Sequence, residues 1–184
     1  ATMSTAQFER YWKVLEAFVV ADGRFEPFEW ALQEVVRARV FPRHGLATRP
    51  KQVVALDDVK QEVRAILSWV ARASGDHDGG LGAYRAGVRV LREHGSAAFG
   101  SEPPLSAGAA ATAVLRRGDH LRGLADVDRR AVLEACEVAA EHDGRLRPQE
   151  AELLRALAEA FGLEPRLTAA RGPAESPDNP GAER

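Results

Sequence analysis

The sequence predicts an all-α fold, a bundle of about seven helices built on two related helix-turn-helix units. Apolar residues recur at steps of three and four along every long segment, the period of a helix with one buried face. A short pattern, Asp-Gly-Arg-apolar-x-Pro-x-Glu, occurs twice between such segments, at residues 22–29 and 143–150. Turn-forming Gly, Ser and Pro residues separate most of the remaining segments.

The repeated pattern predicts a helix end followed at once by a helix start. Gly23 and Gly144 each come just after a periodic run, where glycine commonly takes the left-handed conformation that closes a helix. Pro27 and Pro148 suit the first position of the next helix, because the N–H that proline lacks would be unpaired there anyway. Each copy is therefore the elbow of a helix-turn-helix unit.

The glutamates of the pattern, Glu29 and Glu150, then occupy the third helical position. A carboxylate at that position reaches back to a free backbone N–H and complements the positive end of the helix dipole. We expect both side chains to be helix caps, whatever else they do.

The two units align at a constant offset of 121 residues along their flanking helices. The aligned apolar pairs are Trp12 with Leu133, Leu15 with Cys136, Leu32 with Leu153, Val36 with Leu157 and Val40 with Phe161. Neither unit can bury its apolar stripe alone, so we expect the two to pack against each other and against the helices between them.

The chain is expected to form one domain over residues 4–167. The first unit spans residues 5–41, the middle helices 57–117 and the second unit 126–163. Residues 168–184 are rich in Pro, Gly and charge without apolar periodicity, which predicts a disordered C-terminal tail.

Seven helices are expected, each with one apolar face. Their ranges are 5–21, 27–41, 57–73, 81–93, 105–117, 127–142 and 148–161. The faces predicted to be buried include Tyr11, Phe28, Leu32 and Val127. Asp126 is expected to cap the sixth helix.

Composition excludes several classes of protein. A net charge of −2 argues against a protein that coats nucleic acid. The single cysteine, Cys136, lies on an apolar helix face and is expected in the core. No run approaches the roughly 18 apolar residues of a membrane span, so the chain as written is expected to be soluble.

The segment from Arg37 to Lys51 is basic and contains no acidic residue. Its charges are Arg37, Arg39, Arg43, Arg49 and Lys51. They are expected either to complement the end of a helix within a solvated connector, or to contact an anionic membrane surface.

The repeated pattern also matches the second half of a calcium-binding EF-hand loop, with Asp, Gly, an apolar residue and then Glu at the twelfth place. The first half is missing, because Phe18 and Val20 stand where oxygen ligands belong. No cofactor is expected beyond a weak calcium or other divalent-cation site, formed if folding brings the two units together. Its candidate ligands are Asp22, Glu29, Asp143 and Glu150.

Catalytic motifs are missing from the sequence. There is no HExxH pair, no phosphate-binding Gly-Lys-Ser/Thr loop and no nucleophile elbow. His77, between Asp76 and Asp78, is interpreted as a turn residue, since three adjacent loop residues lack the spacing of a zinc site. We therefore do not expect the chain to be an enzyme.

The Ala-Asp-Gly-x-apolar-x-x-x-Glu stretch at 21–29, and its second copy at 143–150, resemble the TerB-like helical domains of tellurite-resistance proteins. A longer similarity covers residues 19–33, 133–136 and 143–156. These stretches look like the C-terminal soluble region of bacterial HtpX-type membrane zinc metalloproteases, in which two such motifs flank a variable helical middle.

The resemblance implies a noncatalytic regulatory or interaction domain that is associated with a membrane metalloprotease in protein quality control. The partner would be the parent protease or another protein, and the domain would be cytoplasmic, tethered to the inner membrane through the parent. The alternative is a stand-alone TerB-like module that binds a divalent metal in stress or tellurite-type resistance. The zinc ligands of the protease family are not present in this sequence, so no catalytic residue carries over.

Overall fold

A computed structural model describes residues 3–21, 26–46, 52–74 and 80–164 of the chain, and this part is all-α. Its α-helices are α1 (Thr5–Ala21), α2 (Pro27–Val40), α3 (Lys60–Ala73), α4 (Leu81–Glu93), α5 (Ala107–Arg117), α6 (Asp126–Ala140) and α7 (Pro148–Phe161). Three 3-10 turns join them: η1 (Phe41–His44), η2 (Leu56–Val59) and η3 (Gly118–Gly123). The predicted tail at 168–184 and the turn around His77 lie outside the described residues.

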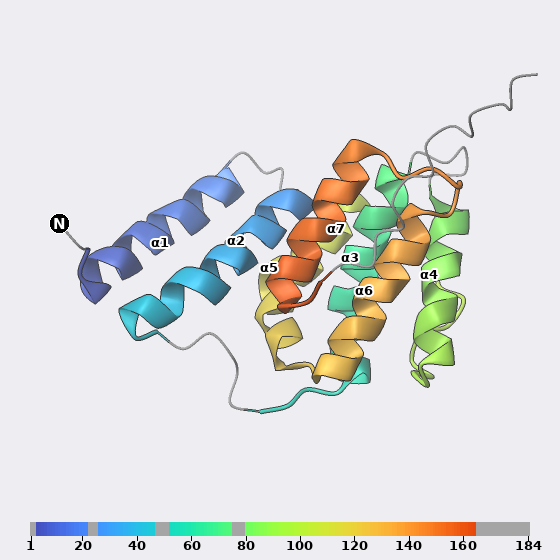
Figure 1. Ribbon diagram of the computed structural model, residues 1–184, viewed down its shortest axis with the longest axis horizontal. Helices are drawn as coiled ribbons and strands as arrows, with labels where there is room; N and C mark the ends of the chain where they lie inside the picture. The colour runs from blue at the N-terminus through green and yellow to red at the C-terminus, as the bar shows by residue number, and fades with distance from the viewer. Residues whose placement is uncertain (1–2, 22–25, 47–51, 75–79, 165–184) are drawn as a thin grey trace, which may run out of the picture.

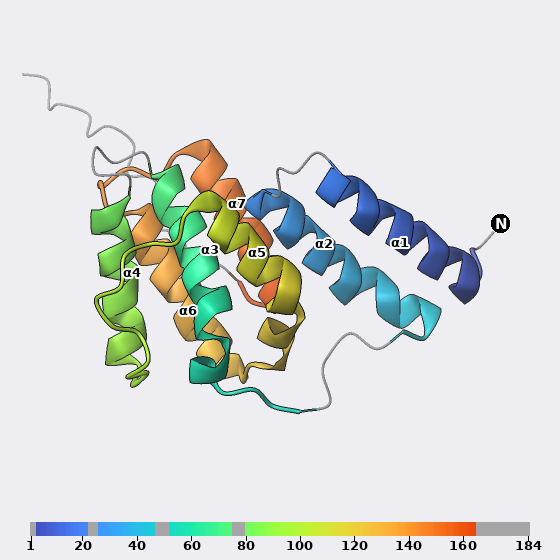
Figure 2. The same cartoon turned by 180° about the vertical axis from the view of Figure 1, so that it is seen from behind.

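Helix α3 is the centre of the bundle. Every residue from Glu62 to Ala71 is buried, because α4, α5, α6 and α7 all pack against this helix. A helix surrounded on all sides needs small or apolar residues around its whole circumference, and α3 has them at most positions. Helix α2 packs on α7, and α1 lies outermost, antiparallel to α2 and furthest from α3 (Figures 1 and 2).

Most helix bounds agree with the prediction, and the differences are at the ends. Helix α2 stops before Pro42, but the chain continues through this proline as a 3-10 turn. Helix α5 starts after Ser106, whose Oγ accepts a hydrogen bond from Ala109 N at 3.3 Å. The prediction for Asp126 is wrong, because Ala125 is the N-cap residue and Asp126, the first helical residue, pairs with Arg129.

The elbows have the capping geometry that the sequence predicts. Glu29 Oε2 accepts a hydrogen bond from Glu26 N at 3.0 Å, and Glu150 Oε2 accepts one from Arg147 N at 2.6 Å. Gly144 is left-handed, with φ of +76°. Asp22 and Gly23, in the first elbow, lie outside the described residues.

The two units pack through their second helices. Helices α2 and α7 run side by side in the same direction, and near their C-terminal ends Arg39 pairs with Glu159 (Figure 1). The environments of the units differ, however, because α6 lies against α3 and α4 whereas α1 lies at the edge of the molecule. Leu153 of α7 is buried, but its aligned residue Leu32 is 51% exposed.

Four residues predicted to be buried are exposed. They are Tyr11 (55%), Phe28 (48%), Leu32 (51%) and Val127 (62%). Helical periodicity identifies an apolar face, but burial also needs a neighbouring element to cover that face. The prediction for Cys136 is confirmed, since its side chain is buried.

Replacing Gly144 with alanine is expected to lower the free energy of unfolding by about 1 kcal/mol. Nothing lies within 4 Å of an added Cβ, so the cost comes from the left-handed backbone alone. Gly108→Ala is the matched control, because this glycine is helical and its Cβ position is equally open. Urea denaturation followed by circular dichroism should show Gly144→Ala as the less stable variant. The opposite order would contradict the role of Gly144 as the helix-ending residue.

Candidate functional site

The first unit forms a distinct edge hairpin, which we define as α1, α2 and η1. It has two surfaces. The outer face carries Tyr11 and Val14 on α1 and Phe28 and Leu32 on α2, all exposed. The other surface is a polar cleft that separates the edge hairpin from α5 and η3.

Aromatic contacts hold the N-terminal half of α1 on η1. The Phe8 ring stacks on the His44 ring with centroids 4.4 Å apart and meets the Phe41 ring edge to face at 5.4 Å. Trp12 meets the same Phe41 ring at 5.1 Å, and Thr5 Oγ1 donates a hydrogen bond to the His44 carbonyl at 3.0 Å. These contacts bury Phe8 and Trp12 and leave the opposite side of α1 in solvent.

Arg37 connects this aromatic cluster with the polar cleft. Its guanidinium lies 4.8 Å from the centroid of the Trp12 ring, within the range of a cation–π contact. It also pairs with Glu16, which accepts a hydrogen bond from Trp12 Nε1 at 2.6 Å. One arginine of α2 thus ties α1 to the side of the cleft.

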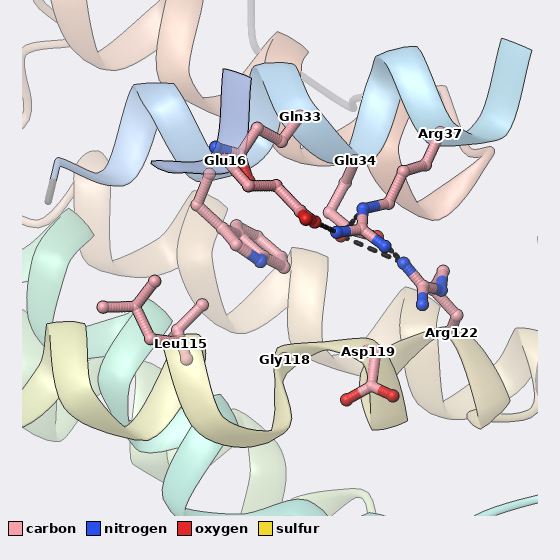
Figure 3. A pocket seen from close by; sticks show the side chains of 10 residues that line it. Glu16, Gln33, Glu34, Arg37, Leu115, Gly118, Asp119 and Arg122 are labelled. Carbon is pink, nitrogen blue, oxygen red and sulfur yellow. Dashed lines mark hydrogen bonds and ion pairs between the residues drawn. The ribbon is translucent and has the colours of Figure 1, made fainter. Parts of the chain in front are cut away.

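The polar cleft is a cavity of about 400 Å³ between α2, α5 and η3 (Figure 3). A chain of ion pairs runs across it from Glu16 through Arg37 and Glu34 to Arg122. Arg122 Nη1 lies 2.9 and 3.1 Å from the two carboxylate oxygens of Glu34, and Arg37 Nε lies 3.6 Å from one of them. The chain links α1, α2 and η3, three elements distant in sequence.

Glu34 is the most deeply buried member of this chain. Burial raises the pKa of its carboxyl, and the charges of Arg122 and Arg37 offset part of that effect. The Nε atoms of Arg37 and Arg122 are buried and have no hydrogen-bond acceptor among the described residues. The guanidiniums of Arg37 and Arg122 are thus already paired with the carboxylates of the cleft. The described lining of the cleft contains no Ser, Thr, Cys, Lys or His. The ion pairs connect the edge hairpin to η3 across the cleft.

The outer face lies on the opposite side of the edge hairpin from the cleft. At 100° per residue, Tyr11 and Val14 are about 140° and 160° around α1 from Glu16. Leu32 is likewise about 140° around α2 from Arg37. One side of the hairpin is thus polar and faces the bundle, and the other is apolar and exposed.

The proposed metal ligands are not gathered in the part of the chain that the structure describes, which contains no group of three or more His, Cys, Asp or Glu side chains placed to hold a metal. Asp143 Oδ2 lies 3.0 Å from Arg147 Nη2, and Glu150 Oε1 lies 3.0 Å from Arg147 Nη1. Glu29 caps α2, and Asp22 is outside the described residues. Capping and pairing account for Glu29, Asp143 and Glu150, and metal binding stays a prediction.

Millimolar calcium is expected to change the melting temperature by less than about 1 °C. A cation at Asp143 and Glu150 would have to displace the guanidinium of Arg147, which contacts both carboxylates. Differential scanning calorimetry with and without calcium measures this, with magnesium as the control. A calcium-specific rise that disappears in Asp143→Asn would contradict the expectation and support the divalent-metal alternative.

The locally basic segment divides into residues with different roles. Arg37 is part of the ion-pair chain, and Arg39 pairs with Glu159 of α7. Arg43 is exposed at η1. Arg49 and Lys51 lie outside the described residues. The two basic residues that lie within α2, Arg37 and Arg39, are therefore used for internal pairing.

Sequence reasoning did not identify the cleft. Glu34 and Arg37 are three residues apart on one helix, and this spacing could have indicated their ion pair. Arg122 is 88 residues further on than Glu34, and nothing in the sequence connects the two. Sequence reasoning also treated Tyr11 and Leu32 as core residues and so missed the outer face.

Comparisons with known proteins identified no relative of this chain. No family model matches the sequence, and no curated protein or solved structure matches it either. None of the described helices is long and apolar enough to cross a membrane.

Proposed function

We propose that the chain is a noncatalytic interaction module that binds a protein partner on the outer face of its edge hairpin. The observation that supports this is the exposure of four large apolar side chains on two adjacent helices, between 48% and 65% of each. Surface apolar residues are ordinarily scattered singly, and a group of them on one face is typical of a docking surface.

A membrane metalloprotease of the HtpX type is the proposed partner or parent. Support comes from the resemblance at the two elbows and along residues 19–33 and 143–156. In this proposal the domain acts on the cytoplasmic side of the inner membrane, tethered through the protease, and it contributes docking to protein quality control. The protease carries out the chemistry.

Photo-crosslinking in cells that make the chain tests the proposal. A benzophenone amino acid replaces Tyr11, which keeps an aromatic ring at this exposed position. The matched control places the same amino acid at Leu115, an exposed apolar residue of α5 beside the cleft. We expect one dominant adduct from position 11, identified by mass spectrometry as a membrane protease, and no such adduct from position 115. Equal or absent crosslinking at the two positions would refute the docking surface.

A further inference from the structure

The second unit shows how the outer side of its first helix is covered. Helix α4 packs along α6 so closely that a Cβ on Gly87 would lie 2.7 Å from the Ala135 carbonyl oxygen. Val132 and Ala135 of α6 are buried. Helix α4 thus lies directly on Ala135, and Val132, three residues before it on α6, is buried as well.

No element that the structure describes covers the same stripe in the first unit. At the repeat offset of 121, Val132 corresponds to Tyr11 and Ala135 to Val14. These two side chains are 55% and 65% exposed, so no described element of the chain takes the place that α4 takes on α6. A helix face that met only water would carry polar residues, but this stripe is apolar in both units.

We propose that the Tyr11–Val14 stripe receives an amphipathic helix from a partner protein, placed on α1 as α4 is placed on α6. The proposal rests on the proposed function and specifies what binds on the α1 part of the outer face. Apolar anchors three or four residues apart on the partner helix would meet Tyr11 and Val14, as in other helix-in-groove complexes.

The charged residues of α1 indicate which residues flank the apolar face of the partner helix. In the second unit, the residue that follows α4 makes a polar contact with α6, since His94 Nε2 lies 3.0 Å from Asp128 Oδ1. On α1, Gln7 stands at the position of Asp128, and Arg10 and Lys13 are exposed within four residues of Val14. The partner helix therefore carries carboxylates on the flank that faces Arg10 and Lys13.

Two readouts of the position-11 crosslink test this inference. First, the crosslinked peptide is sequenced. We expect a segment of another protein with apolar residues at helical spacing and at least two Asp or Glu residues on one flank. A segment of a second copy of the chain, a lipid adduct or a segment without helical periodicity would overturn the proposal.

Second, Arg10→Glu combined with Lys13→Glu is expected to lower the yield of the adduct at least fivefold. Arg85→Glu with Arg92→Glu, two exposed charges on α4, is the matched control and should leave the yield unchanged. An unchanged or higher yield in the α1 variant would overturn the acidic helix. If the chain without these charge substitutions gave no position-specific adduct, the proposed function itself would be overturned.

Discussion

Replacing Gly80 with alanine is expected to lower the free energy of unfolding by about 3 kcal/mol. Two costs combine at this residue, which precedes α4. Its φ is +82°, a left-handed conformation that strains a residue with a Cβ. The added Cβ would also lie 2.2 Å from the carbonyl oxygen of Ala71, and backbone atoms of a packed helix cannot easily move away.

Gly144→Ala separates these two costs. This residue has nearly the same φ, but nothing lies within 4 Å of its Cβ position. The difference between the two variants in urea denaturation therefore measures the close approach of the turn before α4 to the end of α3. If Gly80→Ala were no less stable than Gly144→Ala, the packing of α4 against α3 would have to be revised.

Replacing Glu34 with alanine is expected to lower the free energy of unfolding by about 2 to 3 kcal/mol, because Arg122 and Arg37 would lose their shared carboxylate. Breaking a fully buried ion pair usually costs more than this. We expect a smaller loss here, since both arginine side chains are about one-fifth exposed and can be partly hydrated. Glu34→Gln keeps an oxygen acceptor for Arg122 and should cost much less. Urea denaturation of both variants at neutral pH makes the comparison. Equal losses would show that the negative charge of Glu34, and neither its shape nor an acceptor oxygen, is what the two arginines require.

The stability of Glu34→Gln relative to the native chain should depend on pH. Burial holds the pKa of Glu34 above its ordinary value of 4.5 in the folded protein, so the folded state binds this proton more tightly than the unfolded chain. The carboxyl therefore contributes to stability at low pH, and that contribution is lost as the pH rises from 4.5 through the folded pKa. Glutamine has no such loss. We expect the variant to gain relative stability across this window, and a decrease would contradict the direction of the shift.

Much of the fold was predictable because its signals are local. Proline at the first helical position, glutamate at the third and the left-handed glycine mark the ends of helices without reference to the rest of the chain. The bounds of α1, α4 and α7 follow from such marks and from apolar periodicity.

The surfaces were not predictable, because they depend on which elements become neighbours. Tyr11 and Val132 occupy equivalent positions in the repeat and both lie on an apolar face, but only Val132 is buried. The partner of Glu34 is an arginine from η3, brought close by the packing of three helices that separate the two in sequence. The family resemblance and the calcium hypothesis both started from the elbows, whereas the cleft and the outer face lie along the helices.

Cys136, the only cysteine of the chain, lies fully buried in α6, and burial raises the pKa of its thiol. A thiol reagent in solution can reach it only when the helices around α3 separate, because the thiolate that reacts needs both access and water. Detachment of α1 alone would leave the sulfur shielded. The rate at which Cys136 is labelled therefore measures how often the central bundle opens. Detachment of α1 would not change this rate, so the native cysteine distinguishes the two events.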